Sequence, residues 1–508
     1  MEPFQILCSV AAVILALYYY LTSNFDYWKS RGVPGPRPIP GFGNLKDFLL
    51  RKETLGDYVL KLYTDYKDKP LIGIFTWRTP ILIVKDPELI KNIFIKDFPT
   101  FADRGITTHE KAEPLSQNLF NLNPQRWRPL RAKMSPIFTS RKLKEMFSLI
   151  SDCADHLVHH TEELANKNEP IECCELMAKY TTDVIGSCAF GLEINALSLK
   201  DNEFRRIGRN VFHPPWSDLI RDKIKKFSPW FYDVLGYILP DTEITSFFMR
   251  LVIDSMEYRD KNNIVRHDFI DILRDFKKRS DKMSDIDFTD SLIASQAFLF
   301  FSAGFETSSS VMSNLVYELA LNQEVQNKLR EEINEEYTKR DGNLTYDNIK
   351  EMDYLNKVFK ETLRKYPPMM FYTRKTTSNY TFDSVKANIP KGQYIWIPVF
   401  ALQHDPNIYP EPDIFDPERF NEKAVQNRHP MYFLPFGDGP RNCIASRFAI
   451  YEVTLGILKL LRHYKFEPCE KTEIPYIRNE ETFVTTSKNG IYLKIIKINQ
   501  KNSEDQIV

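Results

Sequence analysis

Several features are scarce or absent in this chain, and each absence narrows the class of protein. Only 18 of the 508 residues are glycine, which argues against disorder over most of the length. The 68 basic and 68 acidic side chains cancel, so the chain lacks the excess of positive charge that binds nucleic acid. Seven cysteines, an odd number at uneven spacing, do not indicate a disulfide framework.

Two further patterns are missing. We find no internal repeat of about 20–50 residues, which argues against a solenoid or propeller. We also find no flavin or dinucleotide fingerprint of the glycine-rich kind. Any reaction that this chain carries out with nicotinamide-derived electrons therefore needs a separate protein to deliver them.

One long uncharged run is present at the N-terminus, Phe4–Leu21. Eighteen apolar residues at about 1.5 Å each just cross a bilayer core of about 30 Å. Lys29 and Arg31 follow the run, which favours a cytosolic location for the rest of the chain. A cleaved secretory signal is the alternative, but neither a basic start nor a small-residue cleavage site is present. We predict a transmembrane anchor over 1–22 and a stiff proline-rich hinge over 23–41.

A glycine-rich loop near the C-terminus carries one cysteine, Cys443, and runs directly into an apolar-periodic segment that predicts a helix. Free backbone N–H groups and the positive end of the helix dipole then face the sulfur. Gly437 and Gly439 allow the tight turn. A buried structural thiol is the ordinary alternative for a cysteine. These neighbours favour a thiolate that is presented to a haem iron.

The loop Phe436-Gly-Asp-Gly-Pro-Arg-Asn-Cys-Ile-Ala445 resembles the haem-binding signature of the cytochrome P-450 family, Phe-x-x-Gly-x-Arg-x-Cys-x-Gly. Phe436, Gly439, Arg441 and Cys443 match it, and Ala445 departs from its last glycine. The resemblance implies that Cys443 binds the iron of haem b and that Arg441 contacts a haem propionate. An added methyl group at Ala445 is expected to crowd the junction between loop and helix.

A second motif, Ala303-Gly-Phe-Glu-Thr-Ser308, lies inside a helix that we expect from about Asp287 to Leu321. Glycine and an acid–alcohol pair are locally unfavourable in a buried helix, and such departures mark functional sites. The resemblance implies that Gly304 makes room for dioxygen, that Thr307 hydrogen-bonds it, and that Glu306 supplies protons. A core helix with a satisfied threonine is the alternative.

Further stretches match the family pattern. Glu361-Thr-Leu-Arg364, in an expected helix over Leu355–Lys365, places an acid and a base on one helix face. By resemblance Arg419 joins them in a buried structural cluster behind the haem. The remaining matches imply propionate contacts from Trp127, Arg131, Arg104 and Arg374. For any single arginine an ordinary surface role is the alternative.

The resemblance covers the chain from Pro34 onward and is closest to insect microsomal members that metabolise insecticides and plant toxins. It implies a mainly α fold with a smaller β portion, a single haem-centred domain over 42–508 that follows the anchor. Strands are expected at Leu71–Trp77, Ile81–Val84, Tyr394–Pro398 and Tyr492–Ile498. By family position, substrate contacts are expected from Phe101 to Phe120, Phe212, Phe298, Ala303, Met369, Phe371 and Phe483.

The expected activity is the insertion of one oxygen atom from dioxygen into apolar small molecules at the endoplasmic reticulum membrane. NADPH-cytochrome reductase, and a cytochrome b-type donor, are the implied partners, and the catalytic domain faces the cytosol. The mixed aromatic and basic segment Phe204–Leu239 is expected to dip into lipid, with ordinary core helices as the rival reading. A hormone or steroid hydroxylase, a reductase-independent haem-thiolate isomerase and a non-catalytic haem protein are the other functions considered. The substrate itself is not encoded in any of these motifs.

Overall fold

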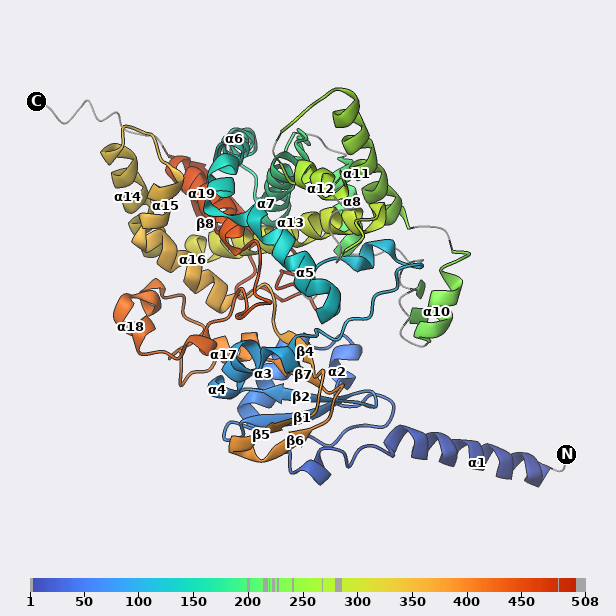
Figure 1. The fold of residues 1–508 in the computed structure, drawn as a ribbon. Coiled ribbons are helices and arrows are strands. Elements are labelled where there is room, and N and C mark those ends of the chain that lie inside the picture. The colour runs from blue at the N-terminus through green and yellow to red at the C-terminus, as the bar shows by residue number, and fades with distance from the viewer. Residues whose placement is uncertain are drawn as a thin grey trace, which may run out of the picture.

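The computed structural model describes residues 3–198, 202–212, 218, 220, 221, 224, 225, 228–239, 242–266, 268–278, 286–482 and 484–498. Figure 1 shows a large helical part and a smaller part built around a β-sheet, from which the first helix projects. This arrangement confirms the predicted mainly α fold with a minor β portion.

The helices are named in chain order. The longer ones are α1 (Pro3–Thr22), α3 (Leu55–Asp65), α5 (Pro124–Met134), α6 (Ser140–Ala165), α7 (Cys173–Ile185), α8 (Glu203–Phe212), α11 (Glu243–Lys261), α12 (Phe269–Lys278), α13 (Asp290–Leu321), α14 (Gln323–Lys339), α16 (Asp353–Lys365) and α19 (Ser446–His463). The shorter ones are α2 (Lys46–Leu49), α4 (Pro87–Lys91), α10 (Pro229–Leu235), α15 (Tyr346–Glu351), α17 (Val399–Gln403) and α18 (Glu422–Gln426).

Helix α13 runs through the middle of the helical part and contacts α7, α11, α16 and α19. It begins where Thr289 Oγ1 accepts a hydrogen bond from the N–H of Leu292 at 3.2 Å, an N-cap that satisfies one of the free donors of the first turn. Most of its 32 residues are buried. The predicted helix over about 287–321 is therefore confirmed, with a start three residues later.

The main sheet has the order β1 (Leu71–Thr76), β2 (Thr79–Val84), β7 (Tyr394–Ile397) and β4 (Tyr372–Lys375). Strands β1 and β2 form an antiparallel hairpin, β7 lies parallel to β2, and β4 is antiparallel to β7. The first three of these strands were predicted. Strand β4 was missed, because its sequence Tyr-Thr-Arg-Lys is short and has no run of apolar residues.

Two small sheets complete the β portion. One has the order β3 (Ile171–Glu172), β9 (Tyr492–Lys497) and β8 (Tyr464–Pro468), and the other pairs β5 (Tyr380–Phe382) with β6 (Ala387–Ile389). Strand β9 confirms the prediction at Tyr492–Ile498. The other four are two to five residues long, too short for a period of two to be recognised.

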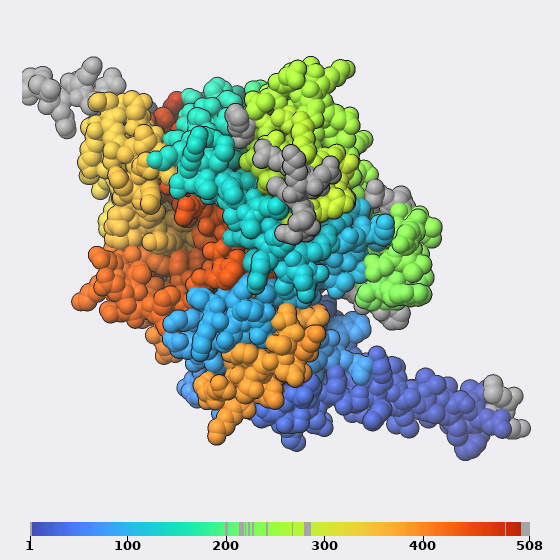
Figure 2. Space-filling model, viewed as in Figure 1, coloured from blue at the N-terminus to red at the C-terminus, as the bar shows by residue number. Residues whose placement is uncertain are grey.

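The N-terminal region divides into an exposed helix and a packed segment. Helix α1 has no buried residue and is long and apolar enough to cross a membrane, and Figure 2 shows it standing away from the body. After it, the Trp28 indole is 3% exposed and donates to the Ile74 carbonyl at 2.9 Å. Val33 is also buried. Part of the segment expected as a stiff hinge over 23–41 is thus packed against β1.

Candidate active site

The loop before α19 is folded by its two glycines. Gly437 has φ +66° and Gly439 has φ +70°, both in the left-handed region. A Cβ at Gly439 would lie 1.9 Å from the Phe94 carbonyl oxygen, so no other residue fits there. At Gly437 a Cβ would meet only Tyr372 at ordinary distances. The tight turn expected at these glycines is present, and at Gly439 the loop also packs closely against the backbone of Phe94.

Cys443 is the cysteine of this loop, and its N–H donates to the Phe436 carbonyl at 2.9 Å. The surrounding protein raises the pKa of the Cys443 thiol by desolvation. The backbone N–H of Ala445 and the charges of Arg131 and Arg104 oppose that rise. A thiolate here is therefore supported by a helix N-terminus and two cations, which are the usual means of stabilising one.

Ala445 replaces a glycine of the family signature without backbone strain. Its φ is −99°, a conformation that any residue adopts. Its methyl group packs at the edge of the large hydrophobic core. The position therefore does not require glycine for its backbone conformation.

Three arginines from distant parts of the sequence lie together beside this loop. Arg104 Nη2 donates to the Arg441 carbonyl at 3.1 Å, and Arg374 and Arg441 are each 2% exposed. Burial and the neighbouring cations lower the pKa of all three, to about 10 for Arg104 and about 9 for Arg441. Only tertiary structure could bring β4, the loop after η3 (Phe98–Phe101) and the Cys443 loop to one place.

This cluster is short of negative charge. Among the described residues no ion pair to a carboxylate is found for Arg104, Arg374 or Arg441, although the charge of Asp103 acts on Arg441. The Nε atoms of Arg374 and Arg441 are buried without a hydrogen-bond partner. Buried cations without a counter-charge are costly, so the site calls for an anionic ligand. The two propionates of a haem fit this donor set.

Trp127 and Arg131 lie on α5 at the edge of the cluster. The Trp127 ring is 4% exposed, with the Arg441 guanidinium 4.5 Å from its centroid. Arg131 donates from Nη1 to the Asn442 carbonyl at 3.0 Å and from Nη2 to Asn442 Oδ1 at 2.9 Å. Arg131, expected to contact a propionate, is thus bonded to the residue before Cys443.

Close helix packing explains Gly304, the glycine in the Ala303–Ser308 turn of α13. A Cβ at Gly304 would lie 2.5 Å from Ile185 Cδ1, so glycine lets α13 approach α7 closely. This packing leaves the predicted role of Gly304 toward dioxygen untested. Thr307 Oγ1 donates to the Ala303 carbonyl at 2.6 Å, and Ala303 is exposed although most of the helix is buried. The Thr307 oxygen therefore remains able to accept a hydrogen bond.

The pKa of Glu306 depends on the charges of two residues that no sequence motif indicated, Arg205 and Glu175. Burial raises the pKa of Glu306, Arg205 lowers it and Glu175 raises it. Arg205 on α8 pairs with Glu175 on α7 at 2.9 Å, and Arg205 Nη1 is buried without a hydrogen-bond partner. The raised pKa makes Glu306 a better proton carrier near neutral pH than an exposed glutamate.

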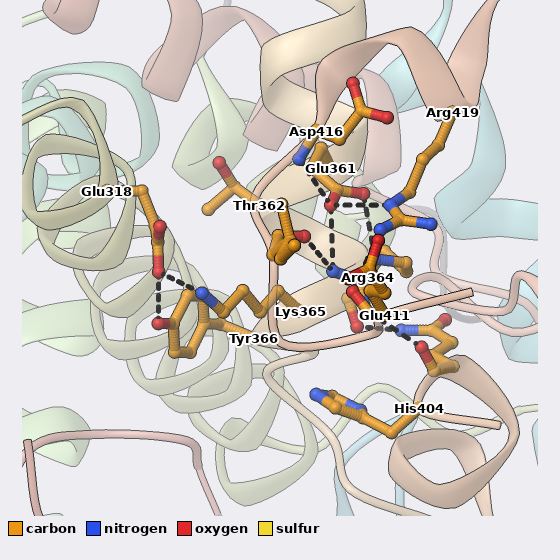
Figure 3. Close-up of polar contacts among 12 residues, drawn as sticks. Glu318, Glu361, Thr362, Arg364, Lys365, Tyr366, His404, Glu411, Asp416 and Arg419 are labelled. Atoms are coloured by element: carbon orange, nitrogen blue, oxygen red, sulfur yellow. Dashed lines mark hydrogen bonds and ion pairs between the residues drawn. The ribbon is translucent and has the colours of Figure 1, made fainter. Parts of the chain in front are cut away.

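The expected Glu361–Arg364–Arg419 cluster is assembled around one carboxylate (Figure 3). Arg364 donates from Nε and Nη2 to the two Glu361 oxygens, each at 2.8 Å, and both side chains are fully buried. Arg419 Nε lies 3.5 Å from Glu361 Oε1, and the N–H of Asp416 donates to the same oxygen at 3.0 Å. The cluster ties α16 to the segment that precedes the Cys443 loop.

Tyr372 is a residue that sequence reasoning missed. Its hydroxyl hydrogen-bonds the carbonyls of Leu434 and Pro435 at 2.9 and 3.1 Å, and so holds the start of the Cys443 loop against β4. No local pattern pointed to it, because the contact joins residues 62 and 63 positions apart. Of the expected substrate contacts, Phe483 lies outside the described residues.

Comparison with known proteins gives a consistent result. The family model described as Cytochrome P450 matches residues 33–494. Probable cytochrome P450 6a14 of Drosophila melanogaster is 40% identical over 506 residues, covering 96% of this chain and 99% of that protein. Cytochrome P450 6A1 of Musca domestica is 39% identical, with 96% of each chain covered. Cytochrome P450 6B7 of Helicoverpa armigera is 37% identical, with 96% and 97% covered.

The family model and the relatives match nearly the whole length of this chain. This result agrees with the cysteine loop and with the arginine cluster, which requires an anionic ligand. Members of the family bind haem b through a cysteine thiolate and act as monooxygenases. The chain belongs to the cytochrome P450 family and is a haem-dependent monooxygenase.

Proposed function

We propose that this protein is a membrane-anchored monooxygenase that oxidises apolar foreign compounds, such as insecticides and plant toxins, with electrons from NADPH. The observation that carries the proposal is the group of arginines beside Cys443, which form no ion pair with a carboxylate in the described part of the chain and include two buried Nε atoms without a hydrogen-bond partner. Cys443 is assigned as the iron ligand, and Arg104, Arg374 and Arg441 as the residues that hold the propionates. Haem b supplies the chemistry that splits dioxygen, with one oxygen atom entering the substrate and the other leaving as water.

In this proposal, two residues of α13 act in proton transfer: Glu306 donates the proton and Thr307 orients its delivery. Glu306, whose raised pKa keeps it partly protonated closer to neutrality, is the proton donor. The Thr307 hydroxyl hydrogen is held by the Ala303 carbonyl, so its oxygen is oriented to accept a hydrogen bond from the reacting centre or a water. Positioning of this kind typically contributes about 10²–10⁴-fold to rate.

Membrane attachment is proposed through two elements. Helix α1 is the anchor, and Lys29 and Arg31 after it favour a cytosolic catalytic domain at the endoplasmic reticulum. Helix α10 and the turn after it expose Trp230 at 76%, Tyr237 at 74% and Ile238 at 78%. Exposed apolar side chains of this density fit an interfacial contact with lipid. Part of the segment Phe204–Leu239 lies outside the described residues.

The electron donor is proposed to be NADPH-cytochrome reductase, with a cytochrome b-type protein as a second donor. The sequence from α5 into α6 is rich in basic residues, which supports docking of an acidic partner: Arg126, Arg128, Arg131, Lys133, Arg141, Lys142 and Lys144. Several of them are already engaged, since Arg126 pairs with Glu110 and Lys144 with Asp347. No ion pair is found for Arg128 or Lys133 within the described part of the chain, which leaves these two for a partner.

The test is turnover of a panel of apolar compounds by purified protein with reductase and NADPH. Products from several unrelated insecticides or plant toxins are expected, each dependent on NADPH. Oxidation of a single steroid-like compound would point to a dedicated hydroxylase. Conversion of a peroxide without NADPH would point to an isomerase. Deleting residues 1–22 should release much of the protein from membranes with its haem retained, and loss of haem would contradict the assignment of an anchor.

A further inference from the structure

A buried carboxylic acid outside the residues assigned so far lies between α19 and α13. Glu452 on α19 is fully buried. Its Oε2 accepts a hydrogen bond from Ser308 Oγ at 2.5 Å, and its Oε1 is buried without a hydrogen-bond partner. Ser308 follows Thr307 directly in α13. Glu452 therefore connects the helix after the Cys443 loop to the turn that contains the acid–alcohol pair.

Within the described part of the chain, no positive charge contributes to the pKa of Glu452. The groups whose pKa values it influences are Tyr180 on α7, Cys153 on α6 and Cys188 in the following π-helical turn η6 (Gly186–Phe190), all neutral acids near pH 7. In the described chain no ion pair involves Glu452. Burial raises its pKa well above the ordinary value, and the hydrogen bond from Ser308 offsets only part of that rise.

A carboxylate at this position would have one oxygen with no donor and no counter-charge, which is strongly unfavourable. A neutral acid avoids this cost. Its O–H can also bond Ser308, and the 2.5 Å separation suits a short hydrogen bond between two oxygens in either direction. We propose that Glu452 is a positioning residue that, as a neutral carboxylic acid, holds the Ala303–Ser308 turn of α13 against α19.

The consequence concerns the orientation of Thr307, so this inference rests on the proposed role of that residue. Ser308 and Thr307 are neighbours in one helical turn, and Thr307 is itself bonded to Ala303. A shift of the turn away from α19 would move the Thr307 hydroxyl with it. A misplacement of about 1 Å can slow a reaction that depends on orientation by about 10²-fold.

The test compares Glu452→Gln, Glu452→Leu and Ser308→Ala, with Ser310→Ala as the matched control. Ser310 lies on the same helix, is 4% exposed, and donates to the Thr485 carbonyl at 2.5 Å rather than to Glu452. Infrared difference spectroscopy of the resting protein should show a carboxylic-acid carbonyl band in wild type that Glu452→Gln lacks. A difference spectrum without that band would overturn the neutral-acid assignment.

Two further measurements test positioning. Amide hydrogen exchange over 303–308 should rise several-fold in Glu452→Leu and Ser308→Ala but not in Ser310→Ala. The same two variants should lose coupling of NADPH consumption to product several-fold, with most of it kept in Glu452→Gln. Exchange and coupling equal to wild type in Ser308→Ala, which is the mildest change, would refute the proposal even if Glu452→Leu fails to fold.

Failure of this inference is distinguishable from failure of the proposed function. The infrared and exchange measurements need no substrate, reductase or turnover. If wild type does not consume NADPH productively, the proposed function fails, while these two measurements still decide whether Glu452 is neutral and whether it holds the turn.

Discussion

Arg131 on α5 donates two hydrogen bonds, of 3.0 and 2.9 Å, to Asn442, the residue before Cys443. One goes to the backbone carbonyl and one to the side chain, so both the position and the orientation of the loop are fixed from α5. The charge of the same guanidinium opposes the rise that desolvation causes in the pKa of Cys443. Arg131 thus combines support of the loop with electrostatic support of its thiolate.

Replacing Cys443 by serine should abolish the red-shifted Soret band of the reduced carbonyl complex, because an alcohol does not provide the thiolate on which that band depends. Cys469→Ser and Cys153→Ser are the controls and should keep the band. Cys153 is buried, and burial raises its pKa to about 12, so it stays protonated. If Cys153→Ser or Cys469→Ser abolished the band while Cys443→Ser kept it, the assignment of Cys443 as the iron ligand would be wrong.

Replacing Arg374 by glutamine should weaken haem binding and leave the apoprotein no less stable. The apoprotein loses a buried cation that repels Arg104 and Arg441, whereas the haem-bound form loses a charge-assisted hydrogen bond worth about 1.5–3 kcal/mol. Haem content and unfolding of both forms measure this. Arg330→Gln, which removes an arginine bonded to the Leu461 carbonyl on α19, should leave haem content unchanged. Equal destabilisation of apo and haem-bound forms by Arg374→Gln would argue against a propionate contact.

Removing the Thr307 hydroxyl in Thr307→Ala should divert reducing equivalents to hydrogen peroxide, because proton delivery loses its orienting group. The loss of coupling should be at least several-fold, given that acid–base positioning contributes about 10²–10⁴-fold. NADPH, product and peroxide are measured together. Thr307→Ser keeps the hydroxyl and should retain most of the coupling. Unchanged coupling in Thr307→Ala would favour a reaction that needs no proton delivery at this position.

His404 should make the protein less stable in mild acid. Burial, and then the charge of Arg364, lower its pKa from 6.5 to about 3. The unfolded chain binds a proton below pH 6.5 and the folded protein does not, so stability present above that pH is lost as the pH falls. The loss at pH 5 is about 2 kcal/mol.

The measurement is the free energy of unfolding at pH 7 and pH 5. His404→Asn can still donate to the Phe400 carbonyl, as the ring nitrogen does at 2.8 Å, and should show a smaller decrease between the two pH values. His159→Asn changes a side chain that is 77% exposed and should leave the decrease as in wild type. An identical decrease in all three proteins would show that His404 is not the titrating group.

The sequence alone determined where the chemistry-bearing segments lie and most of the long elements. The motif around Cys443, the helix with Gly304 and Thr307, and the pair Glu361 and Arg364 were recognisable because each depends on spacing within one turn or one loop. The apolar run of α1 was equally local. Such features follow from the helical and extended repeats of the backbone.

The tertiary structure decided what each of these side chains faces. Gly439 packs against the Phe94 carbonyl, and Arg131 hydrogen-bonds Asn442. The charge of Arg205 acts on the pKa of Glu306, and Glu452 is buried against Ser308. None of these contacts is set by local periodicity, because each joins elements from distant parts of the chain. Burial, which raises or lowers the pKa of the groups involved, exists only once those elements are packed.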